Sequence, residues 1–271
     1  MASRRSPLVQ IFSAVGASMP WASRGGPAAT PPFAAGPDAE APQATPARAR
    51  RIRRSLVISS IEGMIAEVVT ACVGGAMITA WALHLHCSPA LIGVLSSLSF
   101  MSQFIQFPAA WLTSTFGHRR VCIAVVATSR FWLVALALMP LLPFSLHGKQ
   151  IALVVVSAVY ALLSVAGNNA WVAWMGDLVP ASLRGRYFGR RTALCMLGGT
   201  IASVAAGYLL DRARTANIEA LGLATLAVIA VLCGAICLYL MLQQHDPGAE
   251  TATRFELRSA LKQFRDRSAR G

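Results

Sequence analysis

Charged residues are scarce in this chain of 271 residues, and acidic residues are the scarcest of them. Asp, Glu, Lys and Arg make up 13% of the sequence, against about 25% in soluble domains. The 11 acidic residues face 24 basic ones, a formal net charge of +13. A nucleic-acid-binding protein can be as basic, but a mean hydropathy of +0.56 argues against that class and against a nucleic-acid partner. The composition predicts an integral membrane protein whose basic residues lie at one surface.

The sequence also lacks the common motifs of catalysis and metal binding. It contains no CxxC pair, no GxSxG, no P-loop and no HExxH. The six cysteines lie in or beside apolar runs, and only Cys233 and Cys237 are closely spaced. These absences argue against a disulfide framework, a zinc site and an ATP-driven pump. We therefore expect a protein that is not an enzyme and that uses no metal or cofactor.

The two ends of the chain are polar. Residues 1–54 are rich in Ala, Pro, Ser, Gly and Arg without any helical or strand period, which predicts a disordered basic tail. A cleaved signal peptide is the alternative, but Pro7, Gln10 and Pro20 interrupt the weakly apolar stretch. Residues 244–271 are expected to form a basic amphipathic segment on the inner leaflet, or else a partly ordered basic tail.

Six apolar segments between these ends are each near the ~20 residues that cross a bilayer. Turns with His, Pro, Gly or charged residues separate them, and the alternation of a membrane barrel is missing. The predicted fold class is an all-α polytopic membrane protein with six transmembrane helices in residues 55–243. The expected spans are residues 55–81, 90–113, 121–142, 151–176, 192–211 and 219–242.

The basic residues are distributed unequally between the two sets of connecting segments. Seventeen lie in one set, whereas the opposite set holds only Lys149, Arg212 and Arg214. Because Lys and Arg accumulate in cytoplasmic loops, the rich side is expected to be cytoplasmic, with both termini inside. The expected location is the cell (inner) membrane.

Two loops of the basic set resemble those of a known family. The first reads AAWLTSTFGHRRV (109–121) and the second GDLVPASLRGRYFGRR (176–191). With six crossings, they resemble the N-terminal six-helix half of a major facilitator superfamily transporter, over residues 55 to about 270. Gly117 and Arg119 match the family's 2–3 loop pattern G-x-x-x-D-R-x-G-R-R, in which Ser114 replaces the aspartate. Residues 244–271 would then correspond to the family's central loop.

The resemblance implies a gating role for these loops. We expect Gly117 to adopt a positive φ, and Asp177 to pair with Arg119 or Arg184. Such contacts latch the cytoplasmic side in the family; the alternative is that the charges only set topology and contact anionic lipid, together with Arg186, Arg190 and Arg191. The residues assigned to the gating loops are Gly117, Arg119, Arg120, Asp177, Arg184 and Gly185.

Polar side chains inside the apolar segments are costly, at about 2.5–3.5 kcal/mol for a charge at mid-helix, and each calls for a partner or a use. The resemblance implies a transport cavity, in which a glutamate binds a proton or a cationic group and the amides bind substrate. The alternative is that a glutamate pairs with Arg130 while the amides join helices. Trp171 and Trp174 are expected in an interfacial aromatic belt, with stacking on substrate as the alternative. The candidate substrate- or ion-binding residues are Glu62, Glu67, Gln103, Gln106, Arg130, Asn168 and Asn169.

The function implied is secondary active transport of a small solute by alternating access, with proton coupling as an option. Family transporters bind substrate between two six-helix halves. The expected partners are the lipid bilayer, a small-molecule solute and a second half, which is the continued chain, a second copy or a sibling subunit. The alternative is a non-transporting scaffold, sensor or assembly partner that keeps the six-helix bundle.

Overall fold

The computed structural model describes residues 46–244. By compactness the chain divides into residues 1–50 and 51–271, and the helical bundle below is the described part of the second unit. The predicted disordered tail lies outside the described residues as far as position 45. Residues 46–54 differ from that prediction, because they form the first turns of helix α2 (Pro46–Val73). The predicted amphipathic segment 244–271 lies outside the described residues except for Gln244.

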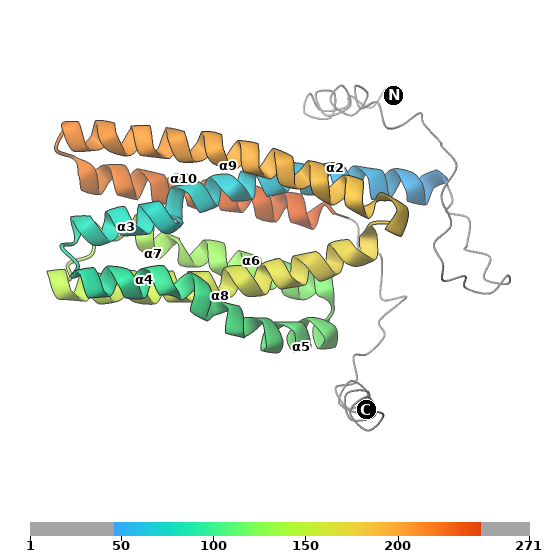
Figure 1. Cartoon of the computed structure of the whole chain (residues 1–271), viewed down its shortest axis with the longest axis horizontal. Helices are drawn as coiled ribbons and strands as arrows, with labels where there is room; N and C mark the ends of the chain where they lie inside the picture. Colours follow the sequence, from blue (N-terminus) through green and yellow to red (C-terminus); the bar gives the residue numbers. More distant parts are fainter. Residues whose placement is uncertain (1–45, 245–271) are drawn as a thin grey trace, which may run out of the picture. The chain divides into compact units, whose positions relative to one another are not determined.

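The described residues are helical and include no strand, as predicted (Figure 1). Six helical stretches are long and apolar enough to cross a membrane, one for each predicted span. The last prediction, 219–242, coincides with α10 (Glu219–Leu242). The remaining elements are α3 (Gly75–His84), α4 (Pro89–Met101), η2 (Ser102–Ile105), α5 (Gln106–Phe116), α6 (His118–Trp132), α7 (Val134–Ala137), α8 (Leu146–Leu178), η3 (Ala181–Leu183) and α9 (Arg184–Thr215).

Two of the spans contain breaks that the sequence analysis did not predict. The first span is interrupted at Gly74, where a Cβ atom would lie 2.4 Å from the carbonyl oxygen of Thr70. The second passes through the 3₁₀ turn η2, just before Pro108. Proline has no N–H to donate to the carbonyl of residue 104, and its ring crowds that carbonyl. Figure 1 shows α5 leaving the line of α4 at this point.

The bundle has two apolar cores. In the larger core α10 packs against α3, α6, α7 and α9, around fully buried side chains such as Trp81 and Leu223. The smaller core joins α6, α8 and α10 around Trp174 and Met175. We call the end of the bundle that carries Gly117 and the η3 turn the arginine-rich end, after Arg119, Arg120, Arg184, Arg186 and Arg190. The smaller core lies in the parts of α6, α8 and α10 nearest this end.

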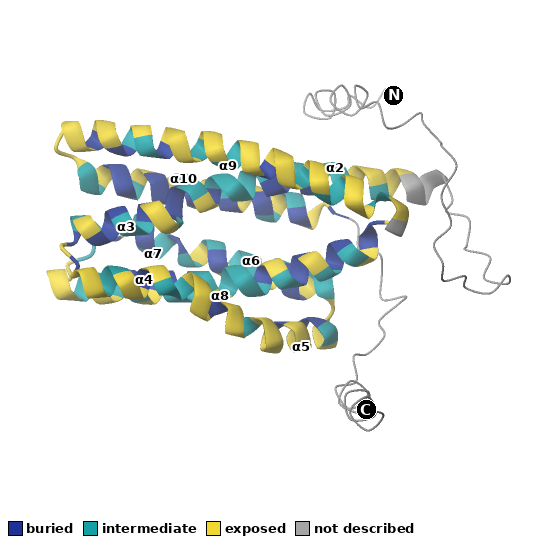
Figure 2. Ribbon diagram, viewed as in Figure 1, coloured by how far each residue is buried: buried dark blue, intermediate teal, exposed yellow. Residues whose placement is uncertain are grey.

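Much of the outer surface is apolar. In the apolar 18-residue stretch of Pro89–Phe116 only 11% of the residues are buried, and in that of Arg184–Thr215 only 17%. The corresponding share in Glu219–Leu242 is 39%. Figure 2 shows exposed positions along α9 and α5. Phe100, Phe104 and Phe107 are among the most exposed side chains. An apolar exterior of this kind suits a protein surrounded by hydrocarbon or by further membrane helices.

Candidate functional site

Four amide side chains from two spans surround one pocket. Gln103 comes from η2 and Gln106 from α5, whereas Asn168 and Asn169 come from α8. The pocket has a volume of about 370 Å³, and Ser164, Val165 and Val172 complete its wall. All four amides were predicted from their depth in the apolar segments, and the structure brings them together.

Hydrogen bonds hold three of these amides in place, two of them through backbone carbonyls. Gln103 Nε2 donates to the carbonyl of Ser99 (3.3 Å), and Gln106 Nε2 donates to Gln103 Oε1. Asn169 Nδ2 donates to the carbonyl of Gln106 (3.1 Å), which ties α8 to α5. The exposed side chain of Asn168 makes no hydrogen bond to any described residue. Its amide is therefore available to a ligand.

A second polar cluster joins α2 to α9. Arg191 Nη2 lies 3.7 Å from Glu62 Oε2, and these side chains are only 18% and 7% exposed. Arg191 Nε donates to the carbonyl of Ser59 (3.4 Å), and its guanidinium lies 3.8 Å from the centre of the Trp171 ring. Burial strengthens both the ion pair and the cation–π contact, because water screens them less. The cluster thus links three spans through one arginine.

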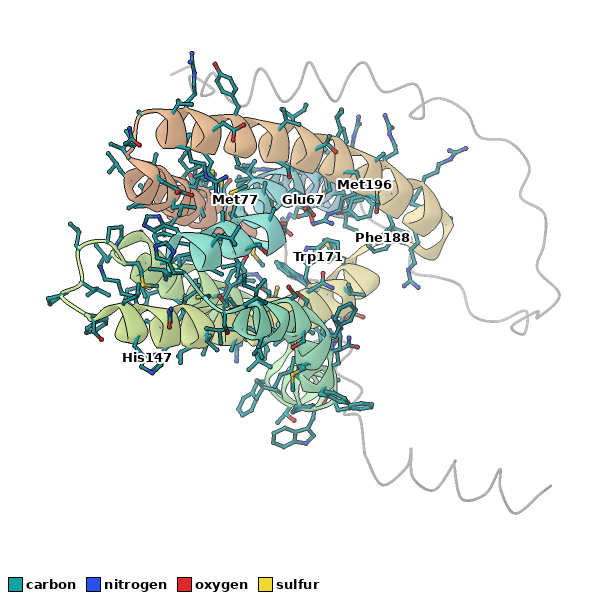
Figure 3. All side chains as sticks on the ribbon, turned by 60° about the vertical axis from the view of Figure 1, so that its left-hand side comes forward. Glu67, Met77, His147, Trp171, Phe188 and Met196 are labelled. Carbon is teal, nitrogen blue, oxygen red and sulfur yellow. The ribbon has the colours of Figure 1, made fainter. Side chains whose placement is uncertain are left out.

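Gly63 makes room for this arginine. A Cβ atom there would lie 2.5 Å from Arg191 Nη2 and 2.9 Å from Cys195 Sγ. On the other side of the cluster, Trp171 meets Phe188 of α9 edge to face, with ring centres 6.1 Å apart (Figure 3). Because Trp171 and Val172 are consecutive in α8, this cluster and the amide pocket share one turn of that helix.

The structure corrects three predictions about the residues of these spans. Arg191 does not lie at the lipid surface, since α9 begins at Arg184 and carries it into the bundle. Trp171 and Trp174 are buried, at 8% and 1% exposure, rather than forming an aromatic belt, because they pack between helices. Arg130 does not pair with a glutamate among the described residues. Its Nη1 donates to Tyr160 Oη (3.2 Å) instead.

Glu67 and Arg130 occupy helix–helix contacts. Glu67 is half-buried, and its carboxylate lies beside Gly199 of α9. The aliphatic part of Arg130 packs on Gly234 of α10, where a Cβ atom would lie 2.7 Å from Arg130 Cδ. Neither residue lines the amide pocket. The sequence analysis did not identify Arg191 as a site residue, because the basic residues around it indicated a loop. Its partner, Glu62, is apparent only from the packing of Arg191 against Gly63.

At the arginine-rich end, Gly117 has a φ of 91°, as predicted for the turn between the second and third spans. The acidic partner there differs from the prediction. Asp177 Oδ2 lies 2.6 Å from His118 Nδ1, so its partner is a histidine and not Arg119 or Arg184. The contact connects the start of α6 to the end of α8. His118 and Asp177 are partly exposed, with side-chain exposures of 36% and 49%.

The two arginines expected to pair with Asp177 cap helix ends instead. Arg119 Nη2 donates to the carbonyl of Leu242 (3.0 Å) at the end of α10. Arg184 donates to the carbonyls of Gly176 (2.6 Å) and Val179 (3.1 Å) at the end of α8. The last carbonyls of a helix have no partner within the helix and carry partial negative charge, which explains why guanidinium groups collect there. Arg120 and Gly185 are exposed.

The opposite end of the bundle carries a smaller polar pocket that the sequence analysis missed. Glu219 Oε1 lies 2.7 Å from Arg214 Nε, and Glu219 Oε2 lies 3.6 Å from His84 Nδ1. With Asn217, these side chains line a pocket of about 300 Å³. Across residues 46–244, no group of three His, Cys, Asp or Glu side chains is arranged to hold a metal ion.

Comparison with known proteins agrees with this architecture. The sequence model of the Major Facilitator Superfamily matches residues 61–270, which is most of the chain. No curated protein and no solved structure shows a significant match. The match covers all six spans from within α2 onward, together with both loops of the arginine-rich end. The chain is a multi-pass membrane protein that belongs to the Major Facilitator Superfamily, a family of membrane transporters.

Proposed function

We propose that this protein is a secondary active transporter, or one six-helix half of one, that moves a small solute by alternating access. The observation that carries the proposal is the pocket that Gln103, Gln106, Asn168 and Asn169 share. Amides inside membrane spans are costly unless they bind one another or a ligand, and Asn168 has no partner among the described residues. A solute supplies the partner that Asn168 lacks.

A second six-helix half completes the pocket in this proposal. Three of the four amides are exposed on the surface of this bundle, beside the exposed Phe104 and Phe107. Transporters of the parallel-repeat type bind solute between two halves related by an axis along the membrane normal. The second half is the continued chain, a second copy or a sibling subunit. Two copies related by a two-fold axis along the membrane normal share one orientation in the membrane.

Glu62 and Arg191 are our proposed coupling pair. A carboxylate in a membrane span keeps its charge only while a cation is near, so a proton on Glu62 would weaken its hold on Arg191. Arg191 also contacts Trp171, the residue before Val172 of the pocket wall. Release of Arg191 from Glu62 would therefore change the packing next to Val172. Glu67 stays the second candidate for the proton. The alternative is that the pair only holds α2 against α9.

The gate and the orientation complete the proposal. The contact between His118 and Asp177 takes the place of the family's latch at the arginine-rich end. The excess of arginine at that end supports a cytoplasmic position for it, and we propose the inner membrane as the location of the protein.

The test is solute flux in proteoliposomes that contain the full chain, with a panel of neutral, cationic and anionic solutes. Replacing Gln106 or Asn168 with Leu should lower uptake of the transported solute about tenfold, because each amide contributes one to two hydrogen bonds. Gln243→Leu is the matched control, since that glutamine is exposed at the end of α10 and away from the pocket. Unchanged uptake in both pocket variants, or no flux of any solute whether the chain is reconstituted alone or together with its second half, would contradict the proposal.

A further inference from the structure

We infer that the solute bound in the amide pocket is uncharged and polyhydroxylated, a neutral sugar or polyol. The inference rests on the proposed transport function and names its substrate class. It starts from the pocket wall, to which Gln103, Gln106, Ser164, Asn168 and Asn169 contribute polar groups without a charge. Val165 and Val172 supply the apolar part of the wall.

No charged group of the described residues lines this pocket, and three charged side chains of the spans have partners of their own. Glu62 pairs with Arg191, Arg130 donates to Tyr160, and Asp177 contacts His118. On this half of the pocket, a charged solute would therefore leave water without meeting an opposite charge. That transfer costs several kcal/mol for a group that is not paired. The wall discriminates against carboxylates, phosphates and ammonium groups because it offers them no opposite charge.

The amides match hydroxyl groups in number and in kind. Each amide presents an acceptor oxygen next to a donor nitrogen, and each hydroxyl both donates and accepts, so one amide can bind two neighbouring hydroxyls. The internal bonds leave the Oε1 of Gln106, the Oδ1 of Asn169 and the whole amide of Asn168 available. The backbone bonds to Ser99 and Gln106 fix the orientation of the other groups, which lowers the entropy lost on binding. The two valines are suited to the C–H face of a sugar ring.

The first experiment measures binding to the full chain in detergent, through the change in tryptophan fluorescence and in thermal stability. The probes are glucose and mannitol, with gluconate and glucosamine as anionic and cationic compounds of similar size. We expect glucose or mannitol to bind at least tenfold more tightly than gluconate and glucosamine. Tighter binding of either charged probe would overturn the inference.

The second experiment introduces a charge into the wall. Asn168→Asp should weaken glucose binding and strengthen glucosamine binding, so that the ratio of the two affinities shifts at least tenfold toward the amine. Asn217→Asp is the matched control, because this exposed asparagine lies at the opposite end of the bundle and should leave the ratio unchanged. An unchanged ratio in Asn168→Asp would overturn the inference.

The outcomes separate this inference from the transport function. If the unsubstituted chain transports a charged solute in proteoliposomes and binds no neutral one, the substrate class is wrong and the transport function stands. If the chain, alone or together with its second half, neither binds nor transports any probe, both are wrong. If glucose or mannitol is bound and transported and Asn168→Asp shifts the ratio, both are supported.

Discussion

The lack of a side chain at Gly63 leaves room for Arg191 beside the buried carboxylate of Glu62. Glu62 was recognised from the sequence as a charge inside an apolar span, but its partner could not be. Arg191 lies 129 positions away in a run of arginines, and nothing in that run distinguishes it from Arg190. Only the packing of α2 on α9 places the guanidinium against Gly63 and Trp171.

The first prediction in this region is a loss of stability in Gly63→Ala. The added methyl group would lie 2.5 Å from Arg191 Nη2 and 2.9 Å from Cys195 Sγ, so the guanidinium must move away from Glu62. We expect a cost of about 1–3 kcal/mol, as for other overpacked sites. Thermal unfolding in detergent measures it, together with transport by the same variant.

Gly75→Ala is the matched control for this substitution. Gly75 lies in the same span and has open space where its Cβ atom would be. Alanine there should be neutral, or stabilising by up to about 1 kcal/mol, because it favours the helix. Equal melting temperatures for the Gly63→Ala and Gly75→Ala proteins would mean that the close approach of Arg191 is wrong.

At the scale of helices, the sequence predicted how many there are and roughly where each lies, since long apolar runs leave few alternatives in a membrane. It did not predict the interruptions at Gly74 and η2, because a glycine or a serine inside an apolar run is compatible with a continuous helix. The amides show the limit clearly. Their depth was readable, but the kink before Pro108 determines how Gln103 and Gln106 face α8.

Arg119 illustrates how one residue stabilises the end of another helix. Its guanidinium donates to the carbonyl of Leu242, the last residue of α10, and lies 5.9 Å from the centre of the Trp174 ring. Arg119→Ala should therefore increase amide hydrogen exchange in the last turn of α10 and in no other helix end. Arg120→Ala is the matched control, because Arg120 is exposed. Equal exchange in the two variants would show that the contact does not hold the helix end.

At the scale of the whole molecule, the fold agrees with the grouping of basic loops that the sequence predicted. The helices bring Arg119, Arg120, Arg184, Arg186 and Arg190 to one end of the bundle. The sequence predicted this, because the loops that hold these arginines are separated by two spans. Lys149, Arg212 and Arg214 lie toward the other end, where Arg214 is engaged with Glu219. Sequence and fold thus fix which loops lie together. The proposed direction of the bundle in the membrane rests on the arginine excess alone, and labelling from one side of the membrane tests it.

Cysteine labelling of intact cells provides that test. Thr215→Cys, at the end of α9 far from the arginine-rich end, should react with a membrane-impermeant maleimide in intact cells. Ser182→Cys, in the η3 turn, should react only after permeabilisation. Both native residues are exposed; Ser182→Cys is close to isosteric, and Thr215→Cys exchanges the hydroxyl for a thiol and removes one methyl group. The reverse pattern would place the arginine-rich end outside.

The native cysteines of the unsubstituted chain determine the background of this labelling, and we expect that background to be low. Five of the six are buried and Cys233 is half-buried. Cys87 is the cysteine that lies between spans, at the same end as Thr215, and burial raises the pKa of its thiol. Its reactive thiolate is therefore scarce at neutral pH and becomes more abundant only as the pH rises. Labelling at pH 7 should thus report Thr215→Cys with little signal from Cys87, and that signal should grow when the same experiment is run at higher pH.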